Sequence, residues 1–144
     1  MSIEITDDGL RRITVARELP TDQASAWEAI ASGPGISAWF FPATLTPEVG
    51  GEITVTFQPE MIARSTITAW APPGRFTAED PTWLPGAPTL YTEWTARALA
   101  DGRSEVRVTH HMETTEETWD SMLRDIVIGW NGFFDNLEKH VAKT

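Results

Sequence analysis

Residues 114–141, TTEETWDSMLRDIVIGWNGFFDNLEKHV, carry the pattern that decides the fold. Their apolar side chains recur mostly at intervals of three or four residues, at Trp119, Met122, Ile126, Trp130, Phe133, Phe134, Leu137 and Val141. This interval is that of one helix face, and the spacing of Thr114 and Glu117 is typical of a capping box. We therefore predict an amphipathic C-terminal helix of roughly twenty-five residues, apolar enough to form the centre of the fold.

The chain before this helix has the pattern of a series of β-strands. Alternating or β-rich runs bounded by turn residues predict strands at 10–19, 53–57, 61–70, 75–79, 90–98 and 105–112. Two short helices are expected after the first strand, over 24–31 and 36–40, with Gly33-Pro34-Gly35 breaking the first. We predict one α+β domain, 1–144, in which a curved antiparallel sheet of about six or seven strands grips the long helix.

Composition argues against several classes of protein. The chain carries 11 Lys and Arg against 21 Asp and Glu, so its net charge of −10 repels phosphate backbones and anionic lipids. No apolar run approaches the ~20 residues of a membrane span, and residues 1–10 are acidic where a signal peptide would be basic. With no cysteine and three histidines, we expect no disulfide, metal site or cofactor, and a cytoplasmic protein without a nucleic-acid partner.

Several short stretches, spread over nearly the whole chain, carry a resemblance to a known family. They are Ile13 to Pro20 with the Trp27 helix behind it, Ala38 to Pro42, Val49 to Gly51, Pro72 to Phe76, and Gly129-Trp130. In this order the chain resembles the helix-grip (SRPBCC) superfamily of START and pollen-allergen-type domains. It is most similar to the family named after the activator of the heat-shock-protein-90 ATPase. The resemblance implies a hydrophobic cavity between sheet and helix, with roles from lipid carriage and polyketide cyclisation to co-chaperone activity. It carries no shared catalytic motif.

Seven tryptophans in 144 residues are the unusual feature of the composition. Given the implied cavity, the candidate ligand-binding residues are Trp39, Phe41, Phe57, Trp70, Phe76, Trp94, His110, Met112, Trp130, Phe133 and Phe134. For any one of them plain core packing is the competing interpretation, because apolar side chains at strand and helix periods are usually core. As a cavity lining, the set would hold an apolar or aromatic ligand through buried area.

His110 and a few other polar side chains are the candidates for orienting a ligand. His110 shares strand parity with Val106, Val108 and Met112, so we expect it on the apolar face. There it is either a general base or ligand contact, or, more commonly, a hydrogen-bonded core histidine. The remaining polar candidates on strands are Arg64, Glu79, Tyr91 and Glu93.

Strand parity restricts these remaining polar candidates. Tyr91 and Glu93 point to solvent if Trp94 points inward. Arg64 enters the cavity only if its strand is regular, because one bulge reverses the faces.

Gly129 and Gly132 interrupt the apolar stretch of the predicted helix. Each costs about 1 kcal/mol relative to alanine in a helix, so a compensating reason is expected. Either they make an adjustable segment over the mouth of the cavity, or they let the helix approach its neighbours closely.

These patterns leave three functional hypotheses. The leading one is non-catalytic binding of a small hydrophobic or aromatic ligand between sheet and C-terminal helix. A second is a cavity enzyme, of cyclase or hydrolase type, that uses His110 as its acid or base. A third is a protein-interaction or co-chaperone module with an exposed apolar patch that includes Trp83. An exposed edge strand would also allow a homodimer, which nothing in the sequence requires.

Overall fold

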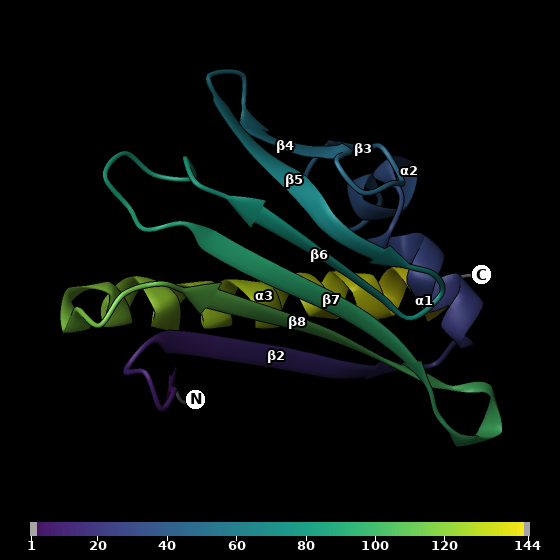
Figure 1. Ribbon diagram of the computed structural model, residues 1–144. Helices are drawn as coiled ribbons and strands as arrows, with labels where there is room; N and C mark the ends of the chain where they lie inside the picture. Colours follow the sequence, from purple (N-terminus) through teal and green to yellow (C-terminus); the bar gives the residue numbers. More distant parts are fainter. Residues whose placement is uncertain (1–2, 143–144) are drawn as a thin grey trace.

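The computed structural model describes residues 3–142 and shows an antiparallel sheet with a long helix across one face (Figure 1). Its strands are β1 (Glu4–Ile5), β2 (Arg11–Leu19), β3 (Ala43–Leu45), β4 (Glu52–Gln58), β5 (Met61–Ala71), β6 (Arg75–Asp80), β7 (Leu90–Ala98) and β8 (Ser104–Met112). Its helices are α1 (Gln23–Ile30), α2 (Gly33–Ser37) and α3 (Asp120–Ala142), with 3₁₀ turns at Ala100–Gly102 and Glu117–Trp119.

The eight strands form one sheet in the order β1-β2-β8-β7-β6-β5-β4-β3, with each neighbouring pair antiparallel. The predicted α+β architecture, with a curved sheet gripping the C-terminal helix and two short helices after the first long strand, is confirmed. The prediction missed β1 and β3, whose two and three residues are too short to show an alternating pattern. Both are edge strands, and β1 pairs with only Arg11 and Arg12 of the much longer β2.

The two short helices begin at side-chain caps. Asp22 Oδ1 accepts a hydrogen bond from the Ser25 amide at 2.8 Å and starts α1, as the Thr21-Asp22 pair indicates. Ser32 Oγ accepts from the Gly35 amide at 2.9 Å and starts α2. Gly33-Pro34-Gly35 therefore opens the second helix, where the sequence predicted only a break. A Cβ on Gly35 would lie 2.0 Å from the Glu28 carbonyl oxygen, so glycine is required where the two helices meet.

The start of α3 differs from the predicted capping box. Thr114 Oγ1 accepts a hydrogen bond from the Glu116 amide at 3.0 Å, within a turn that precedes the 3₁₀ turn Glu117–Trp119. The α-helix proper begins at Asp120, whose Oδ1 accepts from Arg11 Nε of β2 at 3.1 Å. An ion pair across to the sheet thus fixes this end of the helix, and the local cap that the sequence suggested does not form.

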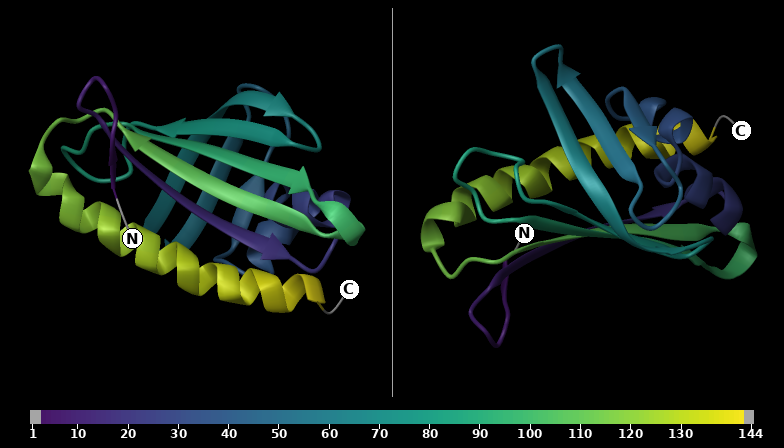
Figure 2. Two further views of the ribbon diagram at one scale, coloured as in Figure 1. Left: turned by 90° about the horizontal axis from the view of Figure 1, so that it is seen from below. Right: turned by 45° about the horizontal axis from the view of Figure 1, so that its top comes forward.

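α3 lies along β2 (Figure 2), and the core forms between this helix and the buried side chains of β2 and β8. One stripe of the helix is buried there, which we call the core stripe: Leu123, Val127, Phe134, Leu137 and Val141. Above it on the sheet, Ile13, Leu19 and Val106 are almost fully buried. At the surface, Arg17 Nη1 of β2 donates to Asp135 Oδ1 at 2.9 Å and to Glu138 Oε1 at 3.1 Å, so β2 and α3 are also joined by ion pairs.

Membrane-spanning helices were not expected from the hydropathy. Over residues 3–142, no helix combines the length and the apolar character needed to cross a bilayer.

Candidate ligand-binding cavity

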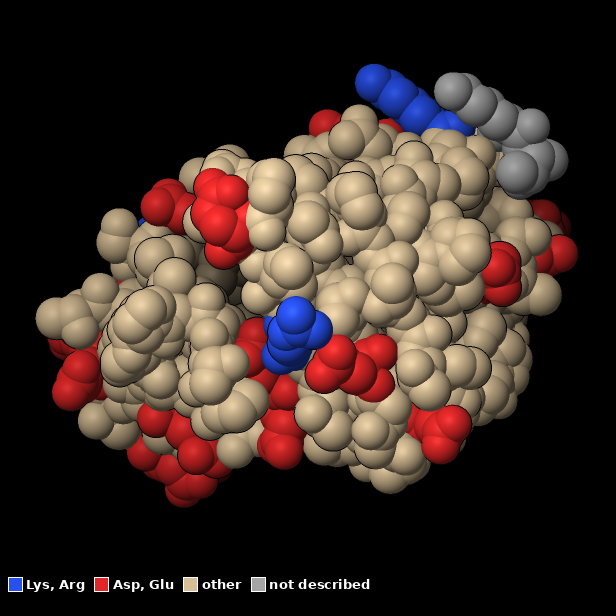
Figure 3. Space-filling model, turned by 90° about the horizontal axis from the view of Figure 1, so that it is seen from above, with Lys and Arg blue, Asp and Glu red and all other residues tan. Residues whose placement is uncertain are grey.

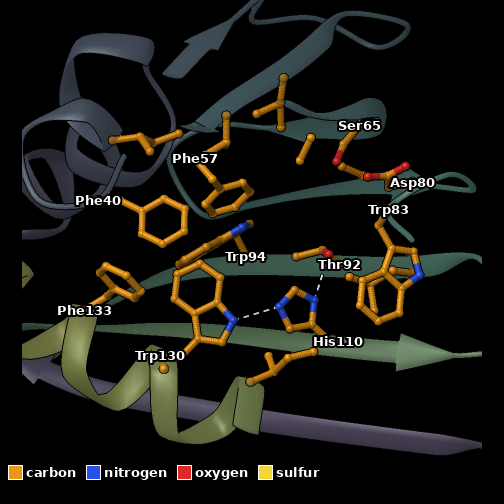
Figure 4. Close-up of a pocket in the computed structure, with 18 of the residues that line it drawn as sticks. Phe40, Phe57, Ser65, Asp80, Trp83, Thr92, Trp94, His110, Trp130 and Phe133 are labelled. Carbon is orange, nitrogen blue, oxygen red and sulfur yellow. Dashed lines mark hydrogen bonds between the residues drawn. The ribbon is translucent and has the colours of Figure 1, made fainter. Parts of the chain in front are cut away.

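A cavity of about 350 Å³ lies between α3 and strands β4 to β8 (Figure 4). Its volume is within the range of small-molecule sites, roughly 300–1,000 Å³. It is lined by Ile36, Trp39, Phe40, Ile53, Val55, Phe57, Ala63, Ser65, Phe76, Ala78, Asp80, Trp83, Leu90, Thr92, Trp94, His110, Ile126, Gly129, Trp130 and Phe133. Most of this lining is apolar, and among residues 3–142 Asp80 is the one carboxylate in it.

β4 and β5 diverge from α3, as Figure 1 shows, and the cavity between them is bordered on β5 by the small side chains of Ala63 and Ser65. On this part of the sheet Val55 lies opposite Ala63, and Ile53 lies opposite Ser65. The stripe of α3 that faces them, which we call the cavity stripe, consists of Ile126, Gly129, Trp130 and Phe133. The cavity stripe is next to the core stripe on the helix. One side of α3 therefore packs in the core, and the adjacent side faces the cavity.

Aromatic rings make one wall of the cavity. Phe40 stacks on Trp130 with ring centroids 5.0 Å apart and planes 22° apart. Phe133 meets Phe40 edge-on at 4.6 Å, and Trp94 meets Trp130 edge-on at 5.2 Å. Trp39 is fixed behind them because its Nε1–H donates to the Ala29 carbonyl at 2.8 Å. Each ring is thus held by its neighbours, and a planar ligand would meet a preorganised surface.

His110 stands at the junction between the rings and a polar end of the cavity. Trp130 Nε1–H donates to His110 Nε2 at 2.8 Å, and His110 Nδ1 lies 2.9 Å from Thr92 Oγ1 (Figure 4). The register of the sheet causes this arrangement, because Thr92 of β7 lies directly opposite His110 of β8. Both ring nitrogens are therefore engaged.

The His110 ring is neutral over the physiological range of pH. Burial lowers the pKa of His110 from 6.5 to about 4, because desolvation penalises the imidazolium; a backbone hydrogen bond at Tyr91 opposes this in part. A general base with this pKa, whose Nε2 already accepts a hydrogen bond, is poorly suited to proton abstraction near pH 7.

The polar end of the cavity combines Ser65, Asp80 and Thr92, beside the ring of Trp83 (Figure 4). Asp80 is 5% exposed, and its Oδ1 accepts from the Thr82 amide at 2.9 Å. Trp83 Nε1–H donates to the Pro88 carbonyl at 2.8 Å, which turns its ring into the cavity wall. The Pro-rich loop therefore contributes a half-buried tryptophan to the cavity, where an exposed one was expected for an interaction module.

Most of the predicted ligand-binding residues line this cavity: Trp39, Phe57, Phe76, Trp94, His110, Trp130 and Phe133. Phe41 stays outside the lining and packs on Phe57 and Phe133 with centroids 4.8 and 5.3 Å away. Trp70 packs on Trp27 at 5.3 Å, away from the cavity. Met112 and Phe134 are fully buried in the core, so the competing interpretation of core packing applies to them.

The polar candidates Arg64, Glu79, Tyr91 and Glu93 lie outside the cavity lining. Arg64 pairs with Glu52 at 3.3 Å on the outer face, because a register shift between Ile67 and Ala69 breaks the parity that links it to Trp70. Glu93 likewise pairs with Arg75 at 2.6 Å.

The sequence analysis missed Ser65, Asp80 and Thr92. Parity could have found two of them, since Thr92 shares the face of Trp94 and Asp80 shares that of Phe76.

The two helix glycines have open space beside them. A Cβ added at Gly129 or at Gly132 would meet no atom within 4 Å apart from the helix itself. The interpretation that they permit close helix packing is therefore wrong. Gly129 lines the cavity, whereas Gly132 is exposed, so only at Gly129 does the missing side chain enlarge the cavity.

This chain is similar in fold to several proteins of known structure. No family model and no curated protein matches the chain. CalU16 from Micromonospora echinospora is 21% identical over 96% of this chain and 80% of its own, with a TM-score of 0.74. MLL2253 from Mesorhizobium loti is 17% identical over 93% and 98%, with a TM-score of 0.75. PFC0360w, a heat-shock-protein-90 activator from Plasmodium falciparum, is 12% identical over 91% and 96%, with a TM-score of 0.72. These similarities show the fold and confirm the resemblance to helix-grip domains.

Proposed function

We propose that this helix-grip domain binds a small apolar ligand with aromatic character between its sheet and α3, without catalysing a reaction on it. The observation that carries the proposal is the cavity of about 350 Å³. One of its walls consists of aromatic rings that their neighbours hold in place. Its mechanism is enclosure: the ligand replaces water against Phe40, Trp94 and Trp130 and gains roughly 25 cal/mol for each Å² of apolar surface it buries.

The hydrogen bonds of His110 favour binding over catalysis. The cavity-enzyme hypothesis needs His110 as an acid or base with a free nitrogen near open volume. Trp130 and Thr92 engage both nitrogens, and the depressed pKa holds the ring neutral. Within the cavity lining, Asp80 is the remaining titratable group, and it is tied to the Thr82 amide.

An interaction module is the second candidate, because the tip of the β4–β5 hairpin exposes apolar side chains. Phe57, Met61 and Ile62 are 36%, 54% and 43% exposed there. An exposed apolar cluster of this kind is typical of a protein-binding surface. Replacing both Met61 and Ile62 by serine would abolish such an interaction, and analytical ultracentrifugation would detect loss of self-association.

The test of the binding proposal is ligand capture by the purified protein. Native mass spectrometry should detect a co-purified small molecule, or tryptophan fluorescence should saturate in titrations with fatty acids, sterols and aromatic polyketides. Ala63→Phe fills the cavity and should abolish the response, because Ala63 lines it. Thr66→Phe is the matched control on the exposed face of the same strand. An unmodified mass with no response, or a response that Ala63→Phe leaves intact, would refute the proposal.

A further inference from the structure

The hydrogen bonds around His110 have a fixed direction. The indole Nε1–H of Trp130 can only donate, so His110 Nε2, 2.8 Å away, must accept and cannot carry the proton. The neutral ring therefore has its proton on Nδ1. Because a protonated Nδ1 can only donate, Thr92 Oγ1 at 2.9 Å is the acceptor. The order of donation runs from Trp130 through His110 to Thr92.

With this direction of donation, the hydroxyl proton of Thr92 has no hydrogen-bond acceptor among residues 3–142. Thr92 cannot donate back to His110, and across residues 3–142 its Oγ1 makes no other hydrogen bond. Thr92 lines the cavity. Its O–H is therefore a donor for whatever occupies the cavity, and the two upstream hydrogen bonds polarise it.

A hydrogen-bond acceptor lies at the same end of the cavity. Asp80 lies opposite Leu90 on β7. It is therefore a diagonal neighbour of Thr92, and such neighbours lie about 7–8 Å apart, with a somewhat shorter distance between their Cβ atoms. Asp80 Oδ1 is held by the Thr82 amide and hydroxyl, at 2.9 and 3.3 Å. Within the described chain Oδ2 makes no hydrogen bond, and it is not among the buried atoms that lack a partner. This oxygen therefore keeps some accessible surface on a residue that lines the cavity.

The charge of Asp80 also restricts the ligand. No Lys or Arg lines the cavity among the described residues, so nothing there neutralises an anionic group. Outside the cavity, acidic side chains predominate over basic ones on the face that Figure 3 shows, in line with the net charge of −10. A carboxylate directed to the polar end would meet Asp80 in a poorly hydrated site.

We propose that the cavity selects aromatic ligands without an anionic group that present a carbonyl-type oxygen to the Thr92 hydroxyl and a hydroxyl or amine donor to Asp80, and that it rejects carboxylates. This inference rests on the proposed function, because it names the ligand class of the same site. The aromatic wall contributes affinity for many apolar ligands, and the polar groups at the other end discriminate among them.

Three probes of nearly equal size separate the contributions: fluorene, 9-fluorenone and fluorene-9-carboxylate. Binding is followed by the shifts of the indole N–H resonances in two-dimensional NMR. The ketone should bind roughly fivefold more tightly than fluorene, the contribution of one hydrogen bond. The carboxylate should bind at least roughly tenfold more weakly than fluorene. Equal affinities for fluorene and fluorenone would overturn the inference.

Two variants assign the preference to Thr92. Thr92→Val removes the hydroxyl at nearly constant shape and should make fluorene and fluorenone equal. Thr92→Ser keeps the hydroxyl and should retain the preference, which controls for loss of folding in the valine variant. A ketone preference that survives Thr92→Val would refute the assignment.

Asp80→Asn tests the charge and retains an Oδ1 acceptor for Thr82. We expect this variant to bind fluorene-9-carboxylate at least roughly threefold more tightly than the wild type does. No gain would refute the charge selection.

Failure of the inference is distinguishable from failure of the proposed function. Fluorene that binds with no preference for the ketone leaves the aromatic cavity intact and removes the polar selection. None of the three probes binding would refute both.

Discussion

The two apolar stripes of α3 lie side by side on one helix and face one sheet, yet they meet different surroundings. The core stripe belongs to the buried cluster along β2, and its Phe134 has 0% exposure behind Trp39 and Trp94. The cavity stripe, with Phe133 one residue earlier, faces the diverging strands β4 and β5 across open volume. The comparison teaches that a side chain's role here follows from the distance between helix and sheet at its position. Its own chemistry decides little.

Exchanging adjacent phenylalanines for alanine tests this comparison most strongly. Phe134→Ala should cost about 3–5 kcal/mol of unfolding free energy, because it leaves a void in close-packed surroundings. Phe133→Ala should cost about 1–2 kcal/mol and should weaken ligand binding more, because its site already borders open volume. Urea unfolding and ligand titration measure the two effects. Equal stability losses would show that the stripes do not differ in packing.

The buried His110, which lines the cavity, predicts that the free energy of unfolding depends on pH. The unfolded chain protonates this histidine near its ordinary pKa of 6.5 and the folded protein only near 4, so acid favours unfolding. The stabilisation is complete above pH 6.5, is lost as the pH falls to 4 and does not change below that. The loss is about 3 kcal/mol.

Urea unfolding of the wild type and His110→Gln between pH 7.5 and 4 measures this term. Their stability difference should shrink toward acid, because only the wild type carries the buried imidazole. Parallel profiles would contradict the burial of a neutral His110.

Trp130→Ala tests whether the cavity stripe serves ligand binding more than stability. The variant removes a ring of the cavity wall and the donor to His110, so we expect ligand affinity to fall at least roughly tenfold. Its stability loss should be smaller than that of Phe134→Ala, because water can enter the cavity and hydrogen-bond to His110 Nε2. Trp27→Ala is the control, since Trp27 does not itself line the cavity and packs behind it on Trp70 and Phe76. If Trp27→Ala weakened binding as much, Trp130 would have no special role.

The helix glycines give the smallest expected effect and a matched pair. Gly129→Ala and Gly132→Ala should each raise the unfolding free energy by about 1 kcal/mol, because both sites have room for the methyl group. Only Gly129→Ala should also weaken ligand binding, because its methyl group enters the cavity. Thermal unfolding and ligand titration would measure both. Indistinguishable affinities in the two variants would show that Gly129 is not kept for the ligand.

The fold was predictable because its decisive periods are long. The strands at 90–98 and 105–112 and the C-terminal helix show their patterns over many residues, and the structure places them within a few residues of the prediction. Short features and single contacts escaped prediction. The edge strands β1 and β3 are too short to show a period, and at the start of α3 the ion pair to Arg11 replaces the expected cap.

The candidate site was less predictable, for two physical reasons. A parity argument fails past a register shift, as it did for Arg64 on β5. Moreover, no local pattern distinguishes Phe133 from Phe134, because the distinction arises from how far the sheet bends away from the helix. Thr92 and Asp80 share the faces of Trp94 and Phe76, so closer attention to parity would have found them.

The ion pairs between Arg17 and α3 have a consequence for protein synthesis. Arg17 and Asp135 are separated by 118 positions in the sequence, so the first long strand and its helical partner leave the ribosome far apart in time. At translation rates of roughly 5–20 residues per second, the interval is on the order of ten seconds. Through most of it β2 also lacks β8, its long neighbour in the sheet, which follows only at Ser104–Met112. The apolar side chains of β2 therefore find their partners on β8 and α3 only after most of the chain has been synthesised.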